Sequence, residues 1–224
     1  MKAVLFDIEN TLVKESKDVS QYFYEAIRSS YGLSIDDIKL SDYEGHTVQE
    51  TVEDILKRQG LSKEEVMEKQ ELFLEELPYA HYNVAGHDKA VLLGGAKDLL
   101  DRLSKKNDYV IGVATGQLER ILRNMFERSG LDYDQYFKFG FYGNTSEHIT
   151  RILDAAINRA EKDYGVKRQD ISFVTNSRRY ASAAHSVGIN AIAVVTDPYS
   201  KKQLDHFEAG HVVKNLKECE KLIK

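Results

Sequence analysis

The feature that most constrains the fold of this chain is a short apolar run that ends at an acidic residue. Ala3 to Phe6 are apolar throughout, as in a strand that is buried on both faces of a parallel sheet. The run stops at Asp7, and the residues after it are acidic or polar. Open α/β sheets bind ligands at the carboxyl ends of their strands, so Asp7 is a candidate site residue. Asp is also an ordinary turn residue, and the local pattern leaves both interpretations open.

Strand and helix patterns alternate in the second part of the chain and are joined by loops of only a few residues. The patterns predict strands over 109–114, 137–141, 170–175 and 190–195, and helices over 96–105, 117–128, 146–164 and 178–187. Helical patterns also start at Ser200 and at Asn215. Such alternation implies βαβ units with right-handed crossovers. We therefore predict an α/β fold with a doubly wound parallel sheet.

The stretch between the first strand and this alternating part has only helical patterns. Two capping boxes, Thr47 with Glu50 and Ser62 with Glu65, predict the starts of two helices. Pro78 predicts the end of the second of them. No strand pattern interrupts these helices, so we expect an all-helical segment.

These patterns predict two structural units. The α/β core should comprise residues 1–13 and 86–224, and an inserted helical domain should comprise residues 14–85. The pattern alone does not say whether the insert covers a binding site or is a plain helical subdomain.

Composition is that of a soluble globular protein, with 42% hydrophobic and 30% charged residues. No apolar run approaches the ~20 residues that span a bilayer, so we expect no membrane partner. The chain begins directly with a strand, and we expect no signal peptide. Its one cysteine, Cys219, cannot form an internal disulfide, which favours the cytoplasm. A net charge of -5 gives no electrostatic reason to expect nucleic acid as a partner.

The segment from Asp7 to Leu12, Asp-Ile-Glu-Asn-Thr-Leu, resembles the Asp-x-Asp-Gly-Thr-Leu motif of the haloacid dehalogenase (HAD) superfamily. The resemblance extends over nearly the whole chain and is strongest to the phosphoglycolate-phosphatase-like branch. It implies a HAD-like Rossmannoid core with a helical cap over the site. It also implies a magnesium-dependent phosphatase that acts through an aspartyl-phosphate on a small phosphorylated metabolite or another anion.

The first family motif implies the catalytic pair. Asp7 would be the nucleophile that attacks phosphorus, and Glu9 would protonate the leaving group and later activate water. Glutamate is one methylene longer than the family's aspartate, and a displacement of about 1 Å can cost ~100-fold in rate. Asn10 replaces the family's glycine in the substrate-binding turn. Asn is the non-glycine residue that best accepts a left-handed backbone.

The second motif is a hydroxyl residue at the end of the next core strand. Thr115 and Gly116 match it, and the resemblance implies that they bind a phosphate oxygen. The local sequence is equally consistent with Thr115 capping the following helix. Both roles are compatible, because a helix N-terminus is itself an anion site.

The third motif is usually a lysine, and this chain has none at the matching position. His148 or Ile149 occupies it, and Arg151 comes two residues too late. A protonated His148 would supply a positive charge to the substrate. The alternative is that His148 is a polar surface residue at a helix start.

The fourth motif usually supplies acids that hold magnesium after the fourth strand. Asn176 and Tyr180 occupy the two acidic positions. The resemblance implies that Asp7, Glu9 and Asn176 would hold the ion (Mg2+). Magnesium prefers carboxylates, so the neutral oxygen of Asn176 weakens this site.

Two arginines fall in the first turn of the helix that follows. The macrodipole disfavours cations at Arg178 and Arg179 by ~0.3–1 kcal/mol each. A partner anion, either Glu9 or a bound phosphate, would explain their placement and make them substrate-binding residues. The alternative is that both are solvated surface side chains.

The sequence thus predicts a HAD-type hydrolase homologue of the phosphatase kind, whose activity through Asp7 is weak or lost. One alternative is an inactive HAD-fold protein that binds an anion or a protein partner. A second alternative is a metal-free hydrolase like the haloacid dehalogenases, which also use the first aspartate.

Overall fold

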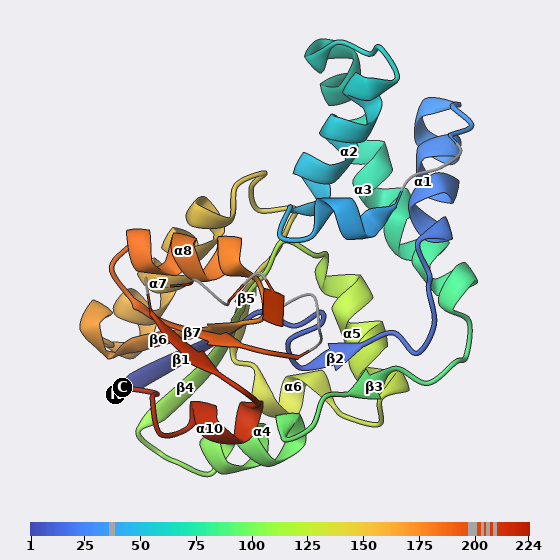
Figure 1. Ribbon diagram of the computed structural model, residues 1–224. Helices are drawn as coiled ribbons and strands as arrows, with labels where there is room; N and C mark the ends of the chain where they lie inside the picture. The colour runs from blue at the N-terminus through green and yellow to red at the C-terminus, as the bar shows by residue number, and fades with distance from the viewer. Residues whose placement is uncertain (36–38, 197–200, 203, 205–206, 208–209) are drawn as a thin grey trace.

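The computed structural model describes residues 1–35, 39–196, 201–202, 204, 207 and 210–224 (Figure 1). Its centre is a six-stranded parallel sheet with the strand order β5-β4-β1-β6-β7-β8. The strands are β1 (Lys2–Phe6), β4 (Tyr109–Ala114), β5 (Phe139–Phe141), β6 (Ile171–Thr175), β7 (Asn190–Val194) and β8 (His211–Val213). The predicted α/β fold with a doubly wound parallel sheet is confirmed.

Helices cover both faces of this sheet, which explains the continuous apolar run of β1. Ala3 and Leu5 pack against the face that carries α7 (Ile149–Tyr164) and α8 (Arg178–Ser186). Val4 and Phe6 pack on the other face. The helices on that face are α4 (Ala96–Ser104), α5 (Glu119–Arg128), α6 (Tyr133–Tyr136) and α10 (Leu216–Cys219).

Most predicted elements of the second part are confirmed, with shifts at their ends. The helix predicted from residue 146 begins at Ile149, because His148 is its N-cap residue. The strand β8 is an addition that the sequence pattern did not predict. The start of the helical pattern at Ser200 lies outside the described residues, and the pattern from Asn215 corresponds to α10. No helix in the described ranges is long and apolar enough to cross a bilayer.

The helical insert comprises α1 (Gln21–Tyr31), the 3-10 helix η1 (Leu40–Tyr43), α2 (Val48–Arg58) and α3 (Lys63–Ala85). Figure 1 shows its helices standing beyond the carboxyl ends of the central strands. Both predicted capping boxes are present, at Thr47 with Glu50 and at Ser62 with Glu65.

The helix α3 does not end before Pro78, as its sequence predicted, but continues to Ala85. A proline inside a helix removes one backbone hydrogen bond and costs ~3 kcal/mol. Here Leu77 and Pro78 are both buried, and α3 packs along α1. Burial of this apolar face outweighs the local preference of proline.

A short antiparallel pair joins the helical insert to the core. β2 (Val13–Lys14) pairs with β3 (Val91–Leu92), so the chain leaves and re-enters the core at adjacent positions. The sequence did not predict either strand. The division into a core and a cap domain at residues 13 and 86 stays a prediction.

Candidate functional site

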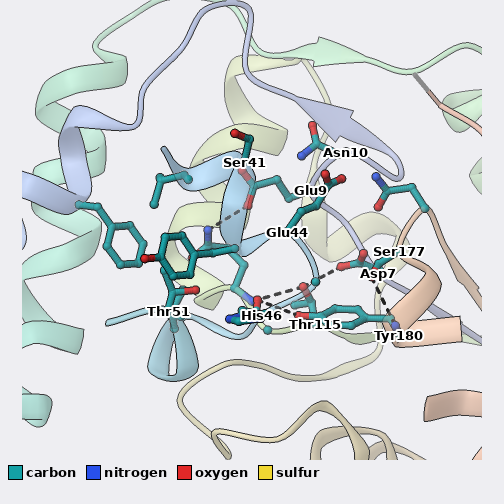
Figure 2. A pocket seen from close by; sticks show the side chains of 18 of the residues that line it. Asp7, Glu9, Asn10, Ser41, Glu44, His46, Thr51, Thr115, Ser177 and Tyr180 are labelled. Atoms are coloured by element: carbon teal, nitrogen blue, oxygen red, sulfur yellow. Dashed lines mark hydrogen bonds between the residues drawn. The ribbon is translucent and has the colours of Figure 1, made fainter. Parts of the chain in front are cut away.

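A pocket of about 340 Å³ lies where the carboxyl ends of β1, β4 and β6 meet the helical insert (Figure 2). Six of the predicted site residues line it: Asp7, Glu9, Asn10, Thr115, Gly116 and Asn176. The three predicted cations do not: Arg178, Arg179 and His148. The parallel sheet therefore gathers the acids, the hydroxyl and the amide, and leaves the positive charges outside.

The Asp7 carboxylate has four hydrogen-bond donors around it. Its Oδ1 accepts from the backbone N–H of Ile8 at 2.9 Å and from Thr115 Oγ1 at 2.8 Å. Its Oδ2 accepts from Thr175 Oγ1 at 3.0 Å and from Thr11 Oγ1 at 3.2 Å. A carboxylate offers about four acceptor positions. Ile8, Thr115 and Thr175 engage three of them, and the single proton of Thr11 is donated either to the fourth or to Asn176 Oδ1.

The three threonine hydroxyls around Asp7 are themselves oriented by the backbone. Each accepts an N–H group at the start of a loop or helix: Gln117 N at 3.4 Å on Thr115, Ser177 N at 3.0 Å on Thr175, and Asn176 N at 3.0 Å on Thr11. A hydroxyl that accepts a backbone N–H directs its own proton elsewhere. The protons of Thr115 and Thr175 therefore point to the carboxylate, and that of Thr11 points either to it or to Asn176 Oδ1, so neutral dipoles surround the charge.

Burial of the Asp7 carboxyl raises its pKa to about 6, although the hydrogen bonds that it accepts oppose the shift. The residue is 5% exposed. Among the described residues that line the pocket there is no lysine or arginine. The negative charge of Asp7 is thus stabilised by hydroxyl and amide dipoles alone, and this support is weaker than its loss of hydration.

Glu9 lies in the same pocket and is held there by a hydrogen bond from Gln117. Gln117 Nε2 donates to Glu9 Oε2 at 3.0 Å and lies 3.4 Å from the hydroxyl of Tyr22 in α1. Burial raises the pKa of Glu9, while the hydrogen bond from Gln117 lowers it. Glu9 therefore holds a proton more readily than a solvated glutamate does.

The backbone geometry at two site positions agrees with the sequence analysis. Asn10 adopts the left-handed conformation, with φ of 59°. At Gly116 a Cβ atom would lie 2.1 Å from Tyr180 Oη and 2.7 Å from Thr47 Cα. Only glycine fits there, because α2 of the helical insert lies directly on this loop.

Magnesium requires oxygen ligands with spare lone pairs, and the predicted set of Asp7, Glu9 and Asn176 supplies few. Three hydrogen bonds already engage the Asp7 oxygens, and the Thr11 hydroxyl donates its one proton either to Asp7 Oδ2 or to Asn176 Oδ1. Among the described residues Asn176 Nδ2 has no hydrogen-bond partner. In the described part of the chain no three His, Cys, Asp or Glu side chains are grouped to hold a metal ion. With Asp7 largely hydrogen-bonded and an amide in place of the usual acid, these donors fit a magnesium ion poorly.

The residues at the remaining family positions contact the helical insert; of these, Tyr180 also lines the pocket, whereas Arg179 and His148 do not. Arg179 donates to Glu50 and to the backbone oxygen of Gly45. Tyr180 Oη donates to the backbone oxygen of His46 at 3.3 Å (Figure 2). His148 is half-exposed, with Nδ1 3.4 Å from Glu50 Oε1. The predicted partner anion of Arg179 therefore exists, but it is Glu50 and not Glu9.

Arg178 differs from its neighbour. It is exposed, and it forms no hydrogen bond or ion pair with the described residues. For Arg178 the interpretation as a solvated surface residue is the one that the structure supports.

The N-terminus of α2 makes further direct contacts with the core. Val48 N donates to Gly116 O at 3.0 Å. Thr47 Oγ1 donates to Glu147 O at 2.7 Å, and Gln49 Nε2 donates to Gly143 O at 2.6 Å. The helical insert thus rests on the loops that follow β4 and β5, and it covers one side of the pocket.

A buried ion-pair cluster lies at the base of the helical insert. Arg128 of α5 pairs with Glu15, which follows β2, and His81 Nε2 of α3 lies 3.0 Å from the same carboxylate. Arg128 Nη1 also donates to the backbone oxygen of Asp88 at 2.8 Å. Burial alone would raise the pKa of Glu15, but the hydrogen bonds from His81 and Arg128 outweigh it and lower this pKa to about 2.

Sequence reasoning missed Thr11, Thr175 and Gln117 as site residues. Thr175 is the last residue of β6, and Thr11 lies inside the first motif. The signal that could have identified Thr175 is its position at the same sheet edge as Asp7. Gln117 carries no such signal, because its role depends on the direction of its side chain.

A family model described as haloacid dehalogenase-like hydrolase matches residues 4–194 of the chain. None of the curated proteins matches it significantly. Several solved structures do, each with low sequence identity over almost the full length of both chains.

One of these is a haloacid dehalogenase-like family hydrolase from Streptococcus pneumoniae, with 16% identity, a TM-score of 0.64, and 99% of this chain and 98% of that chain covered. A predicted phosphoglycolate phosphatase from Haemophilus somnus has 16% identity and a TM-score of 0.69, with 100% and 98% covered. A β-phosphoglucomutase from Clostridium difficile has 17% identity and a TM-score of 0.68, with 100% and 97% covered. At these identities the likeness shows a common fold.

Proposed function

The chain belongs to the family of haloacid dehalogenase-like hydrolases, and we propose that it is a phosphatase-like member whose pocket binds a ligand but has largely lost phosphomonoester hydrolysis. The observation that carries this proposal is the environment of Asp7. Three acceptor positions of its carboxylate are engaged by neutral donors, the Thr11 hydroxyl serves either the fourth or Asn176 Oδ1, and no lysine or arginine is found among the described lining residues.

Hydrolysis through Asp7 would require one of its oxygens to attack phosphorus while the bond to the leaving oxygen breaks. The attacking oxygen would first have to lose hydrogen bonds that the fold supplies, and these bonds lower its nucleophilicity. The charge that develops on the phosphoryl oxygens would also lack a cationic partner in the described lining. Loss of one such electrostatic group typically costs ~100- to 1,000-fold in rate.

A second candidate, slow hydrolysis, is favoured by one observation at Glu9. This side chain lines the same pocket as Asp7, and burial raises its pKa. A raised pKa retains the proton that a leaving group needs, which suits a general acid. The pair of Asp7 as nucleophile and Glu9 as acid would then act without the charge compensation that speeds related enzymes. A dehalogenase-like reaction through Asp7 is the third candidate, and halide release from an α-haloacid would reveal it.

The test is hydrolysis of an aryl phosphate by the wild-type protein and by Asp7→Asn, each with added magnesium and with a chelator. We expect the two proteins to give the same rate under both conditions, because the proposal holds that Asp7 no longer catalyses hydrolysis. Turnover by the wild type that disappears in Asp7→Asn would overturn the proposal and establish the second candidate. Dependence of that turnover on magnesium would further show that the donor set accommodates the ion.

A further inference from the structure

A second cleft, of about 590 Å³, lies where α3 of the helical insert passes the start of α5 in the core (Figure 1). Met67, Leu74 and Pro78 of α3 line it, and Leu118 lines it from the core. Among the described residues, the cleft shares no lining residue with the pocket around Asp7. An occupant of this cleft would therefore contact the helical insert and the core at once, apart from the pocket.

The cleft has a buried apolar floor and a rim that is open to solvent. Leu118 is 5% exposed and Pro78 is buried, whereas Met67 is 60% exposed. Exposed apolar side chains that continue a buried apolar floor are typical of interaction surfaces, and flexible methionines are common where such surfaces adapt to peptides. The open form suits a chain segment that lies across the cleft better than an enclosed small molecule.

Two glutamates of α3 line the cleft without a partner charge. Glu71 and Glu75 are exposed and four residues apart, so they lie one turn apart on the same face of the helix. Neither forms an ion pair with the described residues. Like charges at this spacing destabilise a helix. Positive charge supplied by a partner would replace this repulsion with attraction.

The other two charges of the lining already have neighbours that hold them. Arg123 Nε lies 2.8 Å from Glu119 Oε1, and the Arg120 guanidinium lies over the ring of Tyr79, 4.5 Å from its centroid. Even with Arg120 counted in full, the described lining has three glutamates to one arginine. The cleft is therefore complementary to a positively charged occupant.

Pro78 adds a hydrogen-bond acceptor to the same cleft. Proline has no N–H group, so the carbonyl oxygen of Leu74 lacks the donor that residue i+4 supplies in a regular helix. Both residues line the cleft. A lysine or arginine side chain combines a cationic donor with a hydrocarbon stem. Such side chains match the acids, the free acceptor and the apolar floor together.

We propose that this cleft is a docking site for a basic segment of a partner protein, in which lysine or arginine side chains alternate with aliphatic ones. The cationic groups pair with Glu71 and Glu75, and an aliphatic side chain packs on the apolar floor. This inference goes beyond the proposed function, because the residues that carry it lie outside the pocket.

The probe is the peptide Lys-Leu-Lys-Leu-Lys with blocked ends, titrated into the isotope-labelled full-length protein and followed by NMR at about 0.15 M salt. We expect saturable shifts of the backbone amides in α3 and in residues 118–120, with a Kd below about 1 mM. Replacing every lysine of the peptide with glutamine should weaken binding by about tenfold, because the ion pairs are lost. Replacing both leucines with asparagine should weaken it by about tenfold as well, because apolar burial is lost.

Glu71→Gln and Glu75→Gln should each weaken binding of the lysine peptide by about threefold, the effect of removing one exposed ion pair. Glu76→Gln is the matched control, because it removes an equal charge from the same helix at a position outside the lining. This control should leave the affinity unchanged.

The inference is overturned if the lysine peptide causes no saturable shifts, if its glutamine analogue binds as tightly, or if Glu76→Gln weakens binding as much as the other two variants do. Shifts of the same amides that depend on protein concentration without peptide would identify a second copy of the chain as the occupant, and would likewise overturn it. Hydrolysis of aryl phosphate has no bearing on these outcomes, so the docking site and the proposed function can fail separately.

Discussion

Arg179 in α8 and Glu50 in α2 form an ion pair that connects the core to the helical insert, with Nη1 2.9 Å from Oε2. The two residues lie 129 positions apart in the sequence. The arginine is placed in the first turn of α8, where the helix dipole disfavours it, and Glu50 supplies the compensating charge. The Arg179 side chain is 44% exposed, so the ion pair contributes little to the free energy of unfolding. Its main effect is to fix the position of α2 on the core.

We expect Arg179→Ala to loosen the start of α2 while changing the free energy of unfolding by less than about 1 kcal/mol. The segment 45–50 loses contacts of the guanidinium group with Glu50 and Gly45. Hydrogen–deuterium exchange of that segment should therefore become faster. Arg178→Ala is the control, because this neighbouring arginine makes no contact of that kind with the described residues. Equal exchange in the two variants would show that the pair does not hold the insert.

Ionisation of Asp7 should make the folded protein less stable as the pH rises from about 4 to above about 6. Its ordinary pKa of 3.8 applies to the unfolded chain, and its pKa in the folded state is about 6. Below pH ~4 both states are protonated, and Asp7 has no effect on stability; above pH ~6 the folded state must ionise a buried carboxyl. A difference of about two pKa units corresponds to a loss of up to about 3 kcal/mol.

The measurement is urea denaturation of the wild type and of Asp7→Asn from about pH 4 to about pH 8. Asn cannot ionise, so subtracting the two curves removes the titration of all other groups. The stability of the wild type relative to the variant should fall across this range. A difference that is constant with pH would show that the folded pKa of Asp7 is close to its ordinary value.

Thr175→Val should destabilise the protein by about 2 kcal/mol at pH 7. The substitution removes a donor to Asp7 Oδ2 and leaves the buried N–H of Ser177 without its acceptor. The share of this destabilisation that comes from the lost hydrogen bond to Asp7 should decrease at low pH, where the carboxyl is protonated. Thr175→Ser retains the hydroxyl and should remain close to the wild type. If valine and serine behave alike, the hydroxyl has no role in supporting the Asp7 charge.

Gly116→Ala should cost about 1–3 kcal/mol through overpacking. The new methyl group would meet the Tyr180 hydroxyl and the Thr47 backbone. Tyr180→Phe in the same chain removes the first contact and not the second, so we expect only partial recovery of the free energy of unfolding. Full recovery in the double variant would mean that α2 can move away from this loop.

Arg128→Met should destabilise the protein by about 3–5 kcal/mol, because it removes the permanently charged one of the two partners of buried Glu15. The side chains of Arg128 and Glu15 are each 8% exposed. Adding Glu15→Gln should recover much of that loss, since an uncharged amide tolerates burial better than a carboxylate. Thermal denaturation of the two single variants and the double variant measures the coupling, and strictly additive effects would contradict it.

The sequence was sufficient to place Asp7, Thr115 and Asn176 at one edge of the sheet. Each directly follows a predicted strand, and parallel strands bring their carboxyl ends together. The sequence did not predict in which direction each of these side chains points. Whether Thr175 turns toward Asp7 depends on strand register and pleat, which the sequence pattern does not specify.

Contacts between the helical insert and the core could not be predicted from local sequence patterns, because they depend on long-range packing. The dipole argument indicated that Arg179 needs an anion, but many acids in the chain could supply it. Glu50 is selected by how α2 rests on the core, and that is a long-range property. Pro78 illustrates the same limit, because packing of α3 along α1 overrides a correct local preference.

The pairing of β2 with β3 gives the chain a simple topology. Lys14 lies opposite Val91 in an antiparallel pair, so everything between them is the loop of a β-hairpin. The helices that wall the pocket can therefore change in length and sequence without altering the order of the central strands. Replacing that loop with a two-residue turn would leave the strand connectivity of the core intact. The hairpin loop thus supplies one wall of the pocket, and the parallel sheet supplies Asp7, Thr115 and Asn176 on the other.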